Sequence, residues 1–137
     1  LKAVAYDDDG NPCRETVVRT AGPPARIRLV PEESSLQLRA DGEAMAFVMA
    51  EICDANGILC PTADTRIQFH VEGPLTILAA DNGDQTSLDP FRKDWCRAFN
   101  GRCMLYLGTI AGEAGTARIT ATAPGLEPAV IEIAIDP

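Results

Sequence analysis

Apolar and polar residues alternate along many short stretches of this chain, and Gly, Pro, Asn and Asp separate the stretches. A period of two residues is typical of antiparallel strands with one buried face, whereas helical spacing is almost absent. The pattern predicts strands over residues 25–30, 35–39, 45–53, 65–71, 75–80, 103–110, 117–123 and 129–135. Seven to eight short strands without helices between them predict an all-β fold, an immunoglobulin-like sandwich of two antiparallel sheets.

The stretch 45–53 differs from the others because both of its faces are apolar. One face consists of Ala46, Val48, Ala50 and Ile52, and the other of Phe47, Met49 and Cys53. Such a strand is expected at the centre of a sheet, covered on both sides. Asp54-Ala55-Asn56-Gly57 follows and predicts a tight turn, because Asn and Gly accept positive φ angles.

Residues 1–20 stand outside this plan. Two strand-like stretches flank Asp-Asp-Asp-Gly-Asn-Pro at 7–12, which predicts a hairpin. A lone hairpin is barely stable, so we expect 1–20 to be the last strands of a preceding domain, 21–24 a linker, and 25–137 the immunoglobulin-like domain. The hairpin is expected to dock on Phe47 and Met49. Because the chain starts at Leu1 without Met, we expect it to be part of a longer protein.

The interval 81–101 is about twenty residues long, which in a compact domain indicates a functional loop or one held by special contacts. Phe91, Trp95 and Phe99 recur there at every fourth position, a spacing that would place them on one face of a short helical turn. Aromatic rings stack on sugars, but they more often anchor a loop to the core. These three residues are the candidate carbohydrate contacts.

The same loop contains four acids, Asp81, Asp84, Asp89 and Asp94. Carboxylates on an irregular backbone are potential Ca²⁺ ligands. Acids that favour turns and face solvent are commoner, so Asp81 and Asp84 are only weak calcium candidates. No other metal and no cofactor is expected.

No residue is predicted to be catalytic. No Ser or Cys lies in a nucleophile motif, and the single His70 falls on the outward register of its strand. Glycosidases need two carboxyl groups that face each other across a cleft. A filled sandwich offers no such cleft, so we expect the chain itself to be inert.

The composition excludes two classes of partner. The net charge of −8 and the pI near 4.5 leave no basic stripe with which to bind nucleic acid. No apolar run approaches the roughly 20 residues that a membrane span needs.

Five cysteines are present beside one histidine, without a Cys-x-x-Cys pair, so a zinc site of the usual kind is excluded. Cys53 and Cys60 flank one predicted turn, and Cys96 and Cys103 flank another. Either pair could form a disulfide in an oxidising compartment, and free buried thiols are the equal alternative.

Several segments resemble the C-terminal region of bacterial family 2 glycoside hydrolases of the β-galactosidase type. They are VVRTAGPPARIRL at 17–29, ADG at 40–42 leading into AFV at 46–48, VEGP at 71–74, DNGD at 81–84 and RAFNG at 97–101. Their order and spacing make the resemblance specific, although Trp95 and Cys96 depart from the family's pattern.

The resemblance implies a non-catalytic accessory domain of a secreted enzyme, located in the periplasm or outside the cell. The family's two catalytic glutamates belong to a separate barrel, and neither corresponds to a residue here. The implied partners are the other domains of the enzyme and, as a further option, polysaccharide. Two alternatives stay open: a carbohydrate-binding module that uses the 81–101 loop, and a bacterial immunoglobulin-like adhesin repeat.

Overall fold

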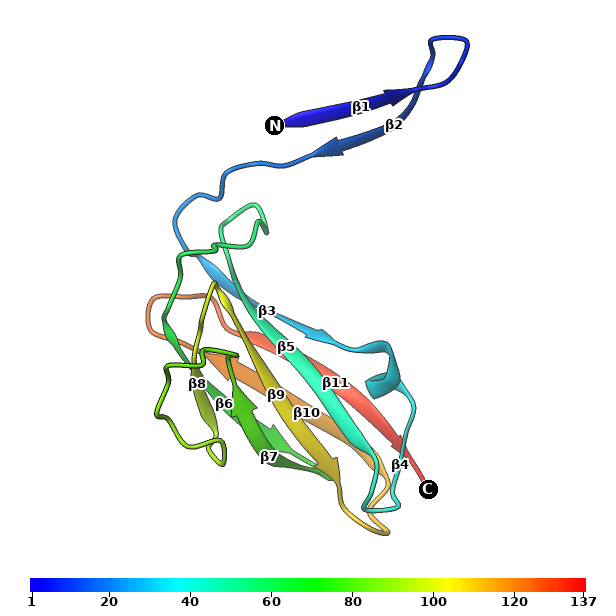
Figure 1. Cartoon of the computed structure of the whole chain (residues 1–137). Helices are drawn as coiled ribbons and strands as arrows, with labels where there is room; N and C mark the ends of the chain where they lie inside the picture. The colour runs from blue at the N-terminus through cyan, green and yellow to red at the C-terminus, as the bar shows by residue number, and fades with distance from the viewer.

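The computed structural model describes all 137 residues, and its strands form three separate sheets (Figure 1). Strands β1 (Lys2–Tyr6) and β2 (Pro12–Val17) make an N-terminal hairpin. The remaining strands form two sheets that face each other. The one helical element is the 3₁₀ turn η1 (Glu33–Leu36), and no helix is long and apolar enough to cross a membrane.

The first sheet of the sandwich has four strands in the order β3-β5-β9-β7. Their bounds are Arg26–Pro31 for β3, Met45–Cys53 for β5, Arg102–Thr109 for β9 and Leu75–Asp81 for β7. The second sheet has five strands in the order β4-β11-β10-β6-β8. Their bounds are Leu38–Arg39 for β4, Ala129–Asp136 for β11, Gly115–Thr122 for β10, Arg66–Glu72 for β6 and Trp95–Arg97 for β8. The predicted all-β sandwich with an N-terminal hairpin is confirmed, although β4 pairs with β11 in parallel.

The prediction of one strand over 35–39 is wrong for most of that stretch, because η1 occupies residues 33–36 and only Leu38–Arg39 joins a sheet. The cause is the buried hydroxyl of Ser35. It accepts the N–H of Phe47 at 2.7 Å and donates to the carbonyl of Phe47 at 3.2 Å. Such side-chain bonds to the backbone compete with a strand ladder.

The helical turn expected at 91–99 is also wrong. Trp95–Arg97 instead forms β8, which pairs with β6 through Gln68 opposite Trp95 and Ile67 opposite Cys96. A strand of three residues is too short for period-two alternation to show in the sequence.

The core lies between the two sheets. Inward side chains of β5 are fully buried, as predicted: Ala46, Val48, Ala50 and Ile52. The opposite sheet contributes buried Ile67 and Phe69 from β6, Ala117, Ile119 and Ala121 from β10, and Ile133 and Ile135 from β11. Burying a large apolar side chain stabilises a fold by about 1.5–3 kcal/mol, so these rows hold the sheets together.

Strand β5 is central in its sheet, as predicted, but this chain covers its outer face only in part, at Cys53, which is fully buried. Phe47 and Met49 on the outer face are half-buried, and Met45 is 39% exposed. The hairpin does not dock on them, because β1 and β2 pair only with each other and project beyond the end of the sandwich (Figure 1).

Candidate functional site

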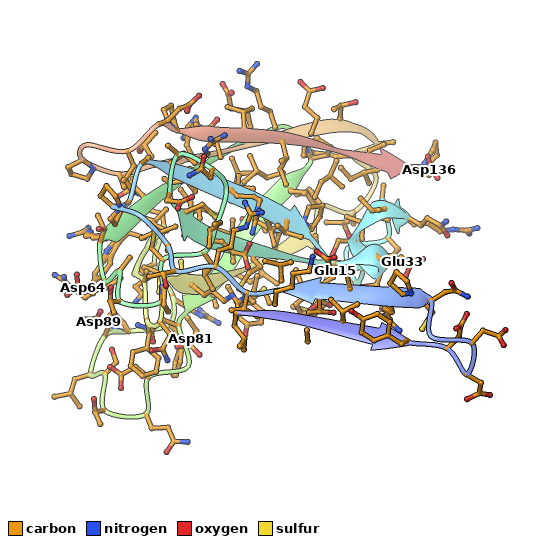
Figure 2. The ribbon with its side chains drawn as sticks, turned by 90° about the horizontal axis from the view of Figure 1, so that it is seen from above. Glu15, Glu33, Asp64, Asp81, Asp89 and Asp136 are labelled. Atoms are coloured by element: carbon orange, nitrogen blue, oxygen red, sulfur yellow. The ribbon has the colours of Figure 1, made fainter.

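The acids of this chain do not converge on a catalytic centre. In the view from above, Asp64, Asp81 and Asp89 lie on the left, whereas Glu15, Glu33 and Asp136 lie toward the middle and the right (Figure 2). The carboxyl groups with clearly shifted pKa values are Asp41, Glu51, Asp54 and Asp84, and hydrogen bonds lower the pKa of each by outweighing the effect of burial. The general acid of a glycosidase needs the opposite shift, a raised pKa.

One shallow hollow of about 210 Å³ is acidic, and it belongs to the loop after β7. It is lined by Asp81, Gly83, Asp84, Gln85, Ser87, Asp89, Phe91 and Lys93. Lys93 places its ammonium nitrogen 3.5 Å from the carboxylate of Asp89. The hydroxyl and the N–H of Thr86 both donate to Asp84, and they lower the pKa of that carboxyl group.

A calcium ion gains no support from this arrangement. No group of three or more His, Cys, Asp or Glu side chains is placed to hold a metal ion. The ammonium group of Lys93 adds a positive charge to the same hollow. Calcium at Asp81 and Asp84 therefore stays a weak prediction.

The three loop aromatics have different surroundings. Trp95 is covered by cations, with the guanidinium carbon of Arg66 3.8 Å from the ring centroid and the ammonium of Lys93 at 4.4 Å. Such cation–π contacts stabilise the ring where it lies. Because the cations occupy positions over the ring, Trp95 is poorly placed to stack on a sugar.

Phe91 and Phe99 lie in two different hollows. Phe91 is 64% exposed at the acidic hollow, and its carbonyl accepts the N–H of Ala80, which fixes the loop to β7. Phe99 is 42% exposed in a second hollow beside Met49 and Met104. Sugar contact at Phe91, Trp95 and Phe99 stays a prediction.

A feature that the sequence did not reveal is the joint between the linker and the sandwich. Asp54, at the end of β5, is 2% exposed. One of its carboxylate oxygens accepts the N–H of Gly22 in the linker at 2.8 Å, and the other accepts the N–H groups of Asn56 and Ile58 at 2.9 Å each. These three bonds lower the pKa of Asp54.

The thiol of Cys60 adds a second contact at the joint by donating to the carbonyl of Gly22 at 3.5 Å. Asp54 was predicted only as a turn residue. Its contact with Gly22 spans 32 positions of the sequence, and no local pattern indicates a bond over that distance. Together the two contacts fix the linker to the sandwich.

All five cysteines are free thiols in the structure, with Cys13 exposed and the other four buried. Cys53 stands opposite Leu59, and Cys60 donates its N–H to Ile52. Cys53 and Cys60 therefore point to opposite sides of this ladder and could not be joined without moving the backbone.

Cys96 and Cys103 are better placed to form a disulfide. They come from β8 and β9, which belong to opposite sheets, and both point into the core. The hydrogen bond with Cys96, together with burial, raises the pKa of Cys103. Of the two predicted disulfide pairs, the structure favours this one.

The comparison with known families decides the affiliation. The model of the glycoside hydrolase family 2 C-terminal domain 5 matches residues 27–132. The chain belongs to this family. The resemblance noted in the sequence is confirmed, and the chain is a C-terminal domain of glycoside hydrolase family 2.

Relatives of this family 2 domain are much longer proteins. The chain is 39% identical to the β-galactosidase BoGH2A of Bacteroides ovatus over 136 residues, which are 99% of this chain and 16% of that protein. It is 30% identical to a β-glucuronidase of Formosa agariphila, over 93% of this chain and 12% of that protein. Among solved structures, a β-glycosidase from Bacteroides vulgatus matches with a TM-score of 0.87 at 28% identity, over 97% of this chain and 17% of that one.

We expect Asp54→Asn to loosen the linker of this family 2 domain, because an amide oxygen accepts hydrogen bonds less strongly than a charged carboxylate. Trypsin should then cleave after Arg19 faster than in the unmodified chain, by about threefold or more. Mass spectrometry of timed digests measures the rate.

Asp64→Asn is the matched control. The Asp64 carboxylate lies 3.9 Å from the guanidinium of Arg97 and is 82% exposed, so this change should leave the linker as it is. Equal cleavage rates in the two variants would show that Asp54 does not hold the joint.

Proposed function

We propose that this chain is the C-terminal accessory domain of a secreted β-galactosidase-type enzyme, and that it supports the enzyme by packing against its other domains. The observation that supports this role is the fixed joint at Asp54 and Gly22. A linker bonded to the sandwich holds the preceding part of the chain in one orientation, which a structural support requires and a freely tethered module does not.

The domain boundaries belong to the same proposal. Residues 1–20 would be the last strands of a preceding sandwich, 21–24 the linker, and 25–137 the accessory domain. Two facts support this division: β1 and β2 pair only with each other, and every residue of β2 is exposed. The exposed residues of the hairpin region include the large apolar side chains of Tyr6, Val17 and Val18. Their exposure is expected if another domain covers them in the full-length protein.

The test of the proposed enzyme is hydrolysis of aryl glycosides by the full-length protein and by the 137-residue chain. We expect the full-length enzyme to hydrolyse an aryl β-galactoside in preference to the β-glucuronide, because the β-galactosidase relative shares the higher identity. The 137-residue chain should hydrolyse neither, since it offers no pair of facing carboxyl groups.

Turnover by the 137-residue chain, lost on mutation of one of its acids, would overturn the accessory role. A full-length enzyme that prefers the glucuronide would replace the galactoside assignment. It would leave the accessory role in place.

The proposed location is the periplasm or the exterior of the cell, where the facing pair Cys96 and Cys103 would be oxidised. In protein purified from the native bacterium, we expect these two cysteines to resist alkylation after denaturation unless a reductant is added. Closing this short loop would stabilise the fold by about 2 kcal/mol. Fractionation that places the protein in the cytoplasm, with five reactive thiols, would contradict the proposal.

A second candidate function is contact with polysaccharide, and Phe91 is the residue that favours it. Its exposed ring adjoins the polar groups of Asp84, Gln85 and Asp89, and sugar sites combine an aromatic face with hydrogen-bonding groups. We expect Phe91→Ala to weaken galactan binding about fivefold or more. Trp95→Ala should leave binding unchanged, because cations cover that ring. Calorimetric titration that detects no binding to the unmodified chain would rule this function out.

A further inference from the structure

The outer face of the four-stranded sheet is apolar, although no other sheet of the chain packs on it. Side chains that are paired across antiparallel strands point to the same side. The register therefore places Val30, Met49 and Met104 in one row, and Phe47, Tyr106 and Ala79 in the next. The rings of Phe47 and Tyr106 are in edge-to-face contact, with centroids 5.8 Å apart.

The apolar surface continues to the end of the sheet. Met45 pairs with Gly108, and the side chain of Leu78 lies over that glycine, where an added Cβ would be 3.1 Å from the nearest methyl carbon. We define the apolar outer face as Val30, Met45, Phe47, Met49, Leu78, Met104 and Tyr106. Of these, Val30, Met45 and Leu78 are exposed and the other four are half-buried.

The outer face of the five-stranded sheet has the opposite character. Arg118 stands between Glu132 and Glu72, and Thr120 stands between His70 and the exposed Val130. This is the polar surface that an antiparallel sheet ordinarily presents to water. The two sheets of one sandwich thus differ, and only the four-stranded sheet has the composition of a face that another protein surface covers.

One end of the apolar outer face is closed by an ion cluster. Glu51 accepts hydrogen bonds from Arg28 at 2.6 and 2.9 Å and from Arg102 at 3.0 Å. Burial alone would raise the pKa of Glu51, but these bonds outweigh it and hold the pKa below its usual value. An apolar centre with a charged rim is the common anatomy of a protein interface.

A hollow of about 290 Å³ opens beside the face. Met49, Met104, Tyr106 and Phe99 are among the residues that line it. A hollow of this size can receive a side chain of a partner, and anchors of that kind contribute much of the binding energy at interfaces.

The position of the hairpin indicates which partner lies there. Seen from above, the five-stranded sheet, the four-stranded sheet and the hairpin follow one another in that order (Figure 2). A domain built on the hairpin would therefore stand beyond the end of the sandwich and toward the side that the apolar outer face looks toward (Figures 1 and 2). In the two curated relatives, the matched segment is only 16% and 12% of the protein. Most of each relative therefore lies outside this segment and includes residues that could cover the apolar outer face.

We propose that the apolar outer face is an interdomain interface, on which a neighbouring domain of the same family 2 polypeptide packs. The inference rests on the proposed accessory function and adds to it the surface that is used. Glu51 and its two arginines form the rim of that contact, and the hollow beside Met49 and Met104 receives a side chain of the partner domain.

Methionine oxidation is the direct test, because the chain has three methionines and all of them, Met45, Met49 and Met104, lie on this face. The full-length enzyme and the 137-residue chain are treated with hydrogen peroxide, and mass spectrometry follows each methionine. We expect Met49 and Met104 to oxidise at least about tenfold more slowly in the full-length enzyme, where the interface excludes solvent.

Equal oxidation rates in the two proteins would overturn the proposal. Slower oxidation in the 137-residue chain as its concentration rises would also overturn it, because a second copy would then be the partner. Hydrolysis of the aryl β-galactoside is measured on the same full-length sample. An active enzyme with unprotected methionines contradicts the interface alone, whereas an inactive protein with protected methionines contradicts the proposed activity alone.

A pair of variants gives a second test that does not depend on oxidation. Met49→Lys adds a charge to the apolar outer face, and Val130→Lys adds one to the outer face of the other sheet. Both positions point away from the core, so neither change should lower the melting temperature of the 137-residue chain by more than about 2 °C. In the full-length enzyme, Met49→Lys alone should lower the melting temperature of this domain, by about 4 °C or more. Equal effects of the two variants there would contradict the interface.

Discussion

The burial of one row of side chains from each strand is the interaction on which this molecule depends. Successive residues of a strand point to opposite sides, so the inward positions of β5 meet those of β6 and β10 and fill the space between the sheets. A filled interior offers no cavity for a reaction. Function is therefore left to the outward positions and to the ends of the strands.

Those remaining positions are not used uniformly. Asp54, directly after β5, bonds to the linker, and Glu51, three residues earlier and on the outer face, bonds to two arginines. Next to Glu51 on the same face, the outward side chains become apolar from Met49 to Met45. One strand thus supplies the core, the joint and the proposed interface, because its alternate residues and its end face different surroundings.

The sequence predicted the regular part of the fold, because long strands such as β5 repeat the period-two signal several times. It did not predict β8, which has three residues, or η1, which follows from the hydrogen bonds of a single hydroxyl group on Ser35. For the candidate site, the sequence singled out Trp95 but could not show that Arg66, from a distant strand, lies over its ring. Contacts between distant residues depend on the finished fold, and a local pattern does not contain them.

The apolar character of both faces of β5 led to the expectation of a strand covered on both sides, and within this chain the second face is covered only at its Cys53 end. A tethered interface resolves the difference. A short linker holds two domains at an effective concentration on the order of 1 mM. A contact with a dissociation constant near 0.1 mM would then be formed about nine-tenths of the time, because the effective concentration is about tenfold higher than the dissociation constant. The face therefore needs only moderate apolar area to stay covered in the full-length protein, and the bond from Asp54 to Gly22 favours the contact further by limiting the motion of the linker.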